Sequence, residues 1–258
     1  MSSFEKAPGL SDSSNVQLRL DPAEDGETNM RMDRDLLQAV ETAPGLMTVV
    51  RVYSWNPPAV SIGRNQKLET ALNFECCRRR KVQVVRRPTG GRAVYHDDEV
   101  TYTVVSNAPA WVGGGIEGSY RIVAGILCSA LERLGVAAEL AKGADRRALR
   151  PRLGREFCPP CFAASSRCEI VVRGRKLVGS AQYRTGRSFL QHGSLPLRID
   201  YPTMAEILGC SPELLEAAMI SLEEAAGRAV SRWEAAEALI QSFRRATGRR
   251  CSSVELGI

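Results

Sequence analysis

Residues 86–99 read RRPTGGRAVYHDDE, a run that cannot form a helix because Pro88 and the adjacent Gly90 and Gly91 interrupt one. Two glycines in a row allow the backbone to pass close to a ligand. Around them lie arginines, a threonine hydroxyl and His96, one of two histidines in the chain. The segment is therefore predicted to bind a molecule that is polar or anionic at one end. A glycine-containing hairpin with solvated arginines is the simpler alternative.

Apolar segments flank this loop on both sides. Residues 82–85 form a short apolar run typical of a buried strand, and residues 100–105 alternate with the period of two that indicates another strand. The loop is therefore predicted to join two sheet strands and to be held by both.

Hydrophobic periodicity predicts the remaining elements. The predicted strands cover residues 16–20, 46–53, 59–62, 136–140, 169–172, 176–182, 189–198 and 251–256. Of these, 46–53 and 59–62 are expected to pair, and the three between 169 and 198 to form a meander. Helices are predicted from Thr28, with Asn29 as a candidate cap, and over 73–81, 116–134, a segment from Ser211 and 235–247. We predict a disordered lead over residues 1–15 and a single domain over 16–258.

The composition narrows the choice of partners. A formal net charge of +6 over 258 residues favours acidic partners. Nucleic acid is not expected, because no recognition motif accompanies the charge and aromatic residues make up only 6% of the chain. No membrane partner is expected either, since no run approaches the roughly 20 apolar residues of a membrane span. Residues 1–15 show no signal-peptide pattern, so we expect a cytoplasmic protein whose 8 cysteines are mostly reduced.

Residues suited to catalysis gather between positions 158 and 194. Cys161 is followed by the segments GRKLVGSAQ at 174–182 and LQHGS at 190–194, which place a lysine and a histidine on adjacent predicted strands beside small residues. Together with RRPTGGRAVYHD, these motifs resemble the biotin/lipoate protein ligase and transferase family. The resemblance covers about residues 29–247. Within that family the chain is most similar to the octanoyltransferases of the lipoyl pathway, in which a catalytic cysteine precedes an invariant lysine.

The resemblance implies a fold and a reaction. The implied fold is α+β, a mixed, mostly antiparallel sheet flanked by helices, as in class II aminoacyl-tRNA synthetases and biotin protein ligases. The implied reaction moves an octanoyl chain from acyl carrier protein through a cysteine thioester to a lysine of a lipoyl domain, such as the glycine-cleavage H protein. Cys161 matches the nucleophile and Lys176 the invariant lysine, which would lower the thiol pKa and help to hold the acyl carbonyl.

The same resemblance implies a substrate-binding set and no metal or cofactor. The matching positions are Arg87, Thr89, Gly90, Gly91, Arg92, His96, Gly179, Ser180, Gln182, His192 and Gly193. We further expect Val94, Val178 and Leu190 to contact the acyl chain. For His96 and His192 a structural hydrogen bond within the sheet competes with a role in proton transfer.

Several alternatives remain open. Cys158 and Cys161 form a C-x-x-C pair, so a zinc knuckle or a regulatory disulfide competes with a free nucleophile. The basic residues at 78–81 and the arginines at 146–155 would steer an acidic partner, or would simply be a solvated helix end and a solvated loop. Among enzymes, an ATP-dependent lipoate-protein ligase and a transferase acting between two protein lysines compete with the transfer from acyl carrier protein. An inactive relative that only binds acylated proteins is the non-enzymatic alternative.

Overall fold

A sheet of eight strands forms the centre of the molecule in the computed structural model, which describes residues 15–68, 72–141, 169–248 and 255–256. Neighbouring strands pair antiparallel except where β1 pairs β2 and β11. The predicted mixed, mostly antiparallel sheet is therefore confirmed. In spatial order the strands are β11 (Glu255–Leu256), β1 (Asn15–Glu24), β2 (Met47–Trp55), β6 (Glu99–Ser106), β10 (Phe189–Pro196), β9 (Arg175–Arg184), β8 (Ile170–Val172) and β7 (Glu139–Leu140).

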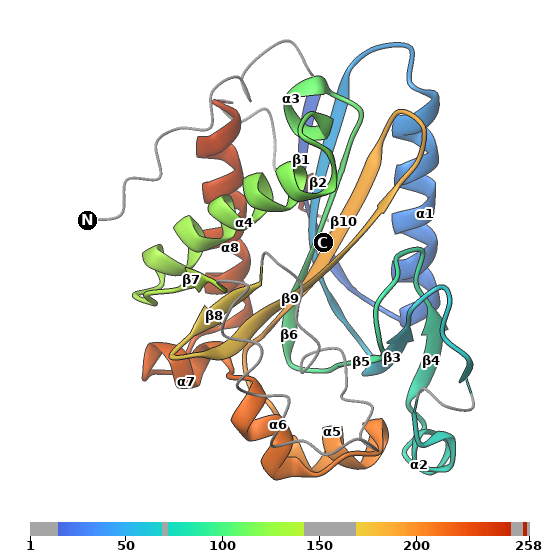
Figure 1. Ribbon diagram of the computed structural model, residues 1–258, viewed down its shortest axis with the longest axis vertical. Helices are drawn as coiled ribbons and strands as arrows, with labels where there is room; N and C mark the ends of the chain where they lie inside the picture. Colours follow the sequence, from blue (N-terminus) through green and yellow to red (C-terminus); the bar gives the residue numbers. More distant parts are fainter. Residues whose placement is uncertain (1–14, 69–71, 142–168, 249–254, 257–258) are drawn as a thin grey trace.

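Helices cover both faces of this sheet (Figure 1). Helix α1 (Gly26–Thr42) packs on one face, while α4 (Gly115–Arg133) and α8 (Arg232–Thr247) pack on the other. Alternation along the strands supplies the two cores: Val49 and Val105 face α1, whereas Val50, Val52 and Val104 belong to the larger core under α4 and α8. Shorter helices complete the chain, namely α2 (Phe74–Arg79), α3 (Pro109–Val112), α5 (Tyr201–Leu208), α6 (Pro212–Ala218) and α7 (Leu222–Ala226).

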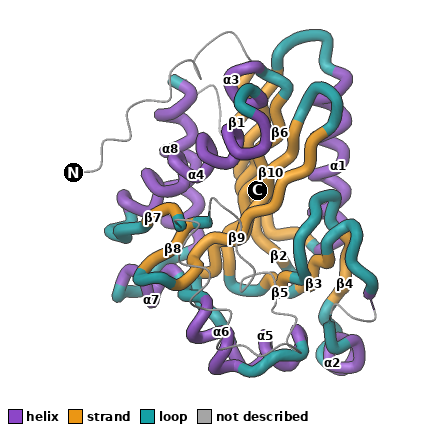
Figure 2. Tube along the Cα trace, in the orientation of Figure 1, coloured by secondary structure: helices purple, strands orange, loops and turns teal. Residues whose placement is uncertain are grey.

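A second, three-stranded sheet carries the glycine-rich loop (Figure 2). Its order is β4 (Gln83–Arg86), β3 (Ala59–Ile62), β5 (Val94–His96). The predicted pairing of 46–53 with 59–62 is therefore wrong. The segment after β4 leads from one sheet strand to another as predicted, but β5 lies within it and the following strand, β6, belongs to the main sheet. Pro57 and Pro58 separate β2 from β3, and because proline has no backbone N–H to donate to a ladder, the chain leaves the main sheet at this point.

The start of α1 differs from the sequence prediction. Asp25 caps the helix, its carboxylate accepting a hydrogen bond from the backbone N–H of Thr28 at 3.0 Å. Asn29, the predicted cap, is instead fully buried and donates its amide to the carbonyls of Glu24 and Ser54.

The predicted disordered lead and the predicted domain both extend beyond the residues that the structure describes. Strand β1 begins at Asn15, one residue inside the predicted lead, and the rest of that lead lies outside the described residues. The single domain over 16–258 stays a prediction.

Within the described ranges, no helix is both long and apolar enough to span a membrane.

Candidate active site

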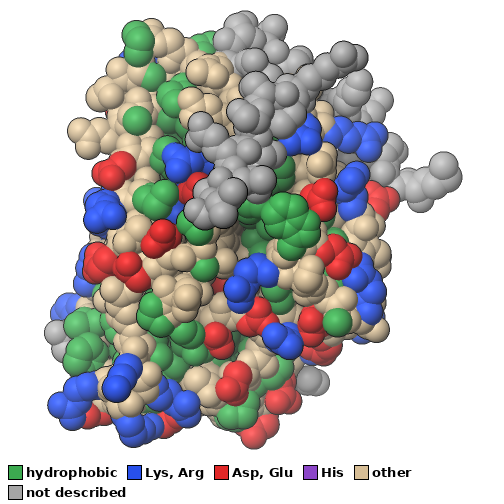
Figure 3. Space-filling model, turned by 180° about the vertical axis from the view of Figure 1, so that it is seen from behind, with side chains coloured by type: hydrophobic (Ala, Val, Ile, Leu, Met, Phe, Trp, Pro, Cys, Tyr) green, Lys and Arg blue, Asp and Glu red, His purple; other side chains and the backbone are tan. Residues whose placement is uncertain are grey.

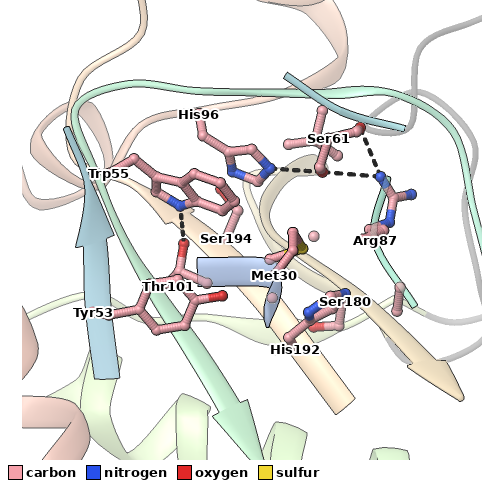
Figure 4. A pocket seen from close by; sticks show the side chains of 14 residues that line it. Met30, Tyr53, Trp55, Ser61, Arg87, His96, Thr101, Ser180, His192 and Ser194 are labelled. Carbon is pink, nitrogen blue, oxygen red and sulfur yellow. Dashed lines mark hydrogen bonds between the residues drawn. The ribbon is translucent and has the colours of Figure 1, made fainter. Parts of the chain in front are cut away.

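A cavity of about 40 Å³ lies between the two sheets (Figure 4). Helix α1, strands from both sheets and the glycine-rich loop all contribute to its wall, and most of the exposed lining is apolar. It gathers residues that are far apart in the sequence. The lining residues are Met30, Tyr53, Trp55, Ser61, Arg87, Val94, His96, Thr101, Gly179, Ser180, Ala181, His192, Gly193 and Ser194.

Arg87 shapes the loop from inside. Its buried guanidinium donates hydrogen bonds to the carbonyls of Ser61 at 2.8 Å, Gly90 at 2.9 Å and Arg92 at 2.6 Å. Arg92 therefore contributes through its backbone, and its side chain does not line the cavity. Arg87 faces the cavity while it fixes the path of the predicted binding loop.

The paired glycines allow a close backbone contact. Gly91 has a φ of 94°, a conformation that L side chains rarely adopt. A Cβ built on Gly63 would lie only 2.1 Å from the Gly91 carbonyl oxygen, so the loop crosses the end of β3 at a distance that only glycine permits. Gly91 and Gly63 thus determine the loop's path, and neither Gly90 nor Gly91 is among the lining residues.

The two histidines occupy matching arrangements. His192 Nδ1 lies 2.9 Å from an Asp33 carboxylate oxygen, and its Nε2 lies 2.7 Å from the Thr89 hydroxyl. His96 Nδ1 lies 2.9 Å from Glu99, and its Nε2 lies 2.8 Å from the Ser61 hydroxyl. Since a carboxylate only accepts, we assign the proton of each ring to Nδ1, which leaves Nε2 to accept from the hydroxyl.

Ionisation supports this assignment for the buried pairs. Burial opposes the charge on Asp33 and Glu99, but hydrogen bonds donated to both carboxylates, and the Arg51 guanidinium beside Asp33, hold the pKa of both carboxyls below the ordinary value. Burial lowers the pKa of His192, and this lowering outweighs the opposing effect of Asp33. His192 is therefore neutral near pH 7 and tied to the loop through Thr89. Both histidines line the cavity, as predicted for site residues. Each of them also makes the structural hydrogen bonds that were predicted as the alternative.

A buried ion pair under His192 was not predicted. Arg51 is fully buried and its guanidinium lies 3.2 Å from Asp33, which also accepts from the Thr103 hydroxyl at 3.0 Å. Arg51 further pairs with Asp21 and donates to the Asn29 side chain at 2.6 Å. The signal in the sequence was a carboxylate at a core position of the α1 periodicity and an arginine inside an apolar strand.

Lys176 lies near the cavity but does not line it. The side chain is buried, and its Nζ lies 2.9 Å from a Glu169 carboxylate oxygen. On β9 it precedes the lining residue Gly179 by three positions, which corresponds to about 10 Å along a strand. Cys161 lies outside the described residues, as do Cys158 and the arginines of 146–155. The contact between Lys176 and Cys161 therefore stays a prediction.

Strands β9 and β10 position some predicted residues in the wall and others away from it. Gly179, Ser180, His192 and Gly193 line the cavity as predicted. Gln182 does not line it; its amide donates to the Gln191 side chain at 3.0 Å. Of the expected acyl contacts, Val94 lines the cavity, whereas Val178 belongs to the core under α4 and α8, and Leu190 to the core under α1. Apolar character alone did not distinguish the wall from these two cores.

Comparison with known proteins identifies the family. Residues 25–244 match the family described as lipoyl protein ligase A/B catalytic domain. The chain belongs to this family. Curated relatives named octanoyltransferase LipM include proteins of Kyrpidia tusciae and Symbiobacterium thermophilum. The protein of Kyrpidia tusciae is 37% identical over 237 residues, covering 88% of this chain and 85% of its own. That of Symbiobacterium thermophilum is 39% identical over 235 residues, covering 86% and 83%.

Solved structures of ligases share the fold. Lipoate-protein ligase A bound with ATP has a TM-score of 0.70 and 21% identity, covering 92% of this chain and 86% of that one. The bi-partite lipoate protein ligase of Thermoplasma acidophilum has a TM-score of 0.70 and 19% identity, covering 91% and 85%. The predicted family and α+β fold are confirmed.

One glycine of this lipoyl protein ligase A/B domain allows a direct test of the cavity wall. A Cβ on Gly193 would lie 2.6 Å from Tyr102 Cε1 and 2.8 Å from the Gly179 carbonyl oxygen. Gly193→Ala is therefore expected to lower the free energy of unfolding by about 1–3 kcal/mol through overpacking, measured by urea denaturation. Gly90→Ala is the control, because a Cβ there meets no atom within 4 Å. Equal stability of the two variants would contradict the wall described above.

Proposed function

We propose that the protein is a protein octanoyltransferase of lipoate biosynthesis, which uses acyl carrier protein as donor and a lipoyl-accepting domain as acceptor. The observation that carries this proposal is the narrow, largely apolar cavity bounded by the RRPTGG loop and by β9, the strand of Lys176. An acyl chain fits an apolar lining, and Arg87 of the loop supplies a charged group to the same cavity. The names of the curated relatives support an acyltransferase.

The first step of the proposed reaction is transfer onto Cys161. Its thiolate attacks the carbonyl carbon of the octanoyl thioester, a new C–S bond forms, and the C–S bond to the donor breaks, so that the donor thiol leaves after taking up a proton. Lys176 stabilises the charge that develops on the carbonyl oxygen. An ammonium group has three N–H donors, so its hydrogen bond to Glu169 does not by itself prevent this role.

The second step releases the product. The neutral amine of an acceptor lysine attacks the Cys161 thioester, an amide C–N bond forms, and the C–S bond breaks while the amine proton passes to the sulfur. The thiol is regenerated. No step requires ATP, because the thioester of the donor already carries an activated acyl group.

The choice between transferase and ligase rests on the cysteine and on the relatives. The curated relatives at 37% and 39% identity are named octanoyltransferases. The solved ligases are 19% and 21% identical and support the fold alone. A ligase makes an acyl-adenylate from ATP and needs no cysteine.

Intact-protein mass spectrometry after incubation with octanoyl-acyl carrier protein, without ATP, tests the proposal. A gain of one octanoyl group that disappears when an acceptor domain is added is expected. Acceptor modification only when free octanoate and ATP are supplied would identify a ligase instead. Saturable binding of acylated protein with no adduct and no acceptor modification would identify the inactive relative.

The structure changes where we expect the acidic donor to bind. Basic side chains gather at the lower left of Figure 3, over α2, but the arginines of the predicted 78–81 cluster have carboxylate partners. Arg78 pairs with Glu75, and Arg79 and Arg80 both pair with Glu206. This cluster therefore fits the alternative of a solvated helix end better than a docking patch.

A groove beside the cavity offers a better basic surface. It has a volume of about 690 Å³, and it adjoins the cavity because Arg87 lines both. Arg34, Arg64 and Arg86 also line it; Arg64 lies over the Tyr183 ring at 4.4 Å, and Arg86 donates to the Gly63 carbonyl at 2.9 Å. Glu41 is the acidic residue of the lining, and its carboxylate accepts from two hydroxyls. We place the acidic donor over this groove.

Charge reversal separates the two surfaces. Arg34→Glu combined with Arg64→Glu is expected to lower the kcat/KM for acyl carrier protein about tenfold at low salt, because steering of an acidic partner is lost. The difference should shrink as salt approaches 1 M, where screening is nearly complete. Arg79→Glu combined with Arg80→Glu is the matched control and should have a smaller effect. A larger loss in the control would return the docking surface to α2.

A further inference from the structure

The cavity follows a straight row of residues across the main sheet. Tyr53 on β2 is paired with Thr101 on β6, Thr101 with Ser194 on β10, and Ser194 with Gly179 on β9. All of them line the cavity. Three steps between neighbouring strands span about 14 Å. The row therefore gives the cavity two distinct ends, one at β2 and one at β9.

The two ends differ in chemistry. Lys176 lies on β9, three positions before Gly179, so in the proposed reaction the acyl carbonyl lies on the β9 side of the cavity. At the other end Met30, Tyr53 and Trp55 form an apolar cluster with Ala59 and Val85. The methyl end of an acyl chain that fills the cavity therefore meets this cluster.

Most of the side chains at this end are held in place. The Tyr53 hydroxyl donates to Asp33 at 3.3 Å, and the Trp55 ring N–H donates to the Thr101 hydroxyl at 2.8 Å. The Trp55 ring also stacks on His96, with 4.0 Å between ring centroids and an interplanar angle of 11°. Neither aromatic ring can move without losing a hydrogen bond.

Met30 differs from these neighbours. Its side chain is 1% exposed and points into the cavity among His96, Arg87 and His192 (Figure 4). Methionine is unbranched, has three rotatable bonds and no hydrogen bond to lose, so it is the adjustable apolar group of this wall. The volume of about 40 Å³ is well below the roughly 150 Å³ of an engineered apolar cavity that binds one benzene molecule. An eight-carbon chain therefore requires this side chain to move.

We propose that Met30 is the residue that sets the length of the acyl chain: it swings aside to admit the chain and stops its methyl end against the fixed rings of Tyr53 and Trp55. This inference rests on the proposed function. Shortening residue 30 should lengthen the space beyond the methyl end, and the preferred substrate should become longer.

Acyl carrier proteins loaded with hexanoyl, octanoyl, decanoyl and dodecanoyl groups test this proposal through the kcat/KM of each. Met30→Ala is expected to raise the decanoyl-to-octanoyl ratio at least about tenfold, since a single methylene discriminates by about 10–200-fold in an apolar pocket. Met30→Leu keeps the side-chain volume and should preserve the preference for octanoyl. Should Met30→Ala fail to fold, Met30→Val carries the same expectation with a smaller truncation.

Met204→Ala is the matched control. Met204 is also buried, at 5% exposure, but it belongs to the cluster beneath the three-stranded sheet and does not line the cavity. An equal shift in ratio for Met204→Ala, or an unchanged ratio for Met30→Ala, would overturn the role of Met30 while octanoyl transfer stands. Absence of transfer by the unaltered protein from every donor would instead reject the proposed function.

Discussion

Replacing Cys161 with alanine is expected to abolish octanoyl transfer, lowering kcat by roughly 10⁴-fold or more, because loss of a nucleophile removes the covalent route entirely. The variant should also show no octanoyl adduct by intact-protein mass spectrometry, even with excess donor and no acceptor. Its unfolding transition should stay close to that of the unaltered protein, so that the loss is one of chemistry.

Cys158→Ala is the matched control for this prediction, since it changes the other member of the C-x-x-C pair. It should keep full activity and form the octanoyl adduct. If Cys158→Ala loses the adduct and Cys161→Ala keeps it, the nucleophile has been assigned to the wrong thiol. If zinc accompanies the purified protein and is lost in both variants, the pair is a metal site.

Replacing Asp33 with alanine is expected to lower the free energy of unfolding by about 3–5 kcal/mol, because Arg51 is then left buried with one carboxylate fewer. Urea denaturation measures this. Asp35→Ala is the matched control, since Asp35 is an exposed carboxylate on the same helix, and a change of about 0.5 kcal/mol or less is expected there. Adding Arg51→Met to Asp33→Ala should recover part of the loss. Similar losses for Asp33 and Asp35 would contradict the importance of the buried pair.

The acid dependence of stability follows from the same group. The pKa of Asp33 in the folded protein is lowered, so its contribution to stability is fully present above its unfolded pKa of about 4. That contribution is lost as the pH falls through the folded value. The difference between the unaltered protein and Asp33→Ala should therefore narrow in acid.

The sequence predicts local elements well where one pattern covers them. The meander of β8, β9 and β10 and the α8 capping box at Ser231 and Glu234 follow from periodicity and capping alone. The loop and the small residues of the wall follow from sequence motifs. A motif gives the spacing of its residues along the chain, but it does not show which of their side chains face the cavity. For that reason Gln182 was placed in the wall although its amide bonds to Gln191.

The rest depends on contacts between distant segments. Arg51, Asp33 and His192 come from β2, α1 and β10, and no local pattern links them. The assignment of β3 to a second sheet likewise depends on which strands approach β4 and β5 in space. Val178 and Leu190 were expected to contact the acyl chain because they are apolar, but apolar character does not show that each side chain packs in one of two separate cores.

The way in which the two sheets meet has a consequence for the acylated state. Away from the apolar cluster of Met30, hydrogen bonds between polar side chains hold the two sheets together beside the cavity. One joins Thr89 to His192. His96 makes the other connection, because it bonds to Ser61 through one ring nitrogen and to Glu99 through the other. An octanoyl chain lying in the cavity would add apolar contacts between the two sheets. The thioester intermediate would therefore be more stable toward separation of the sheets than the free enzyme, and the substrate would serve for a time as part of the hydrophobic interior.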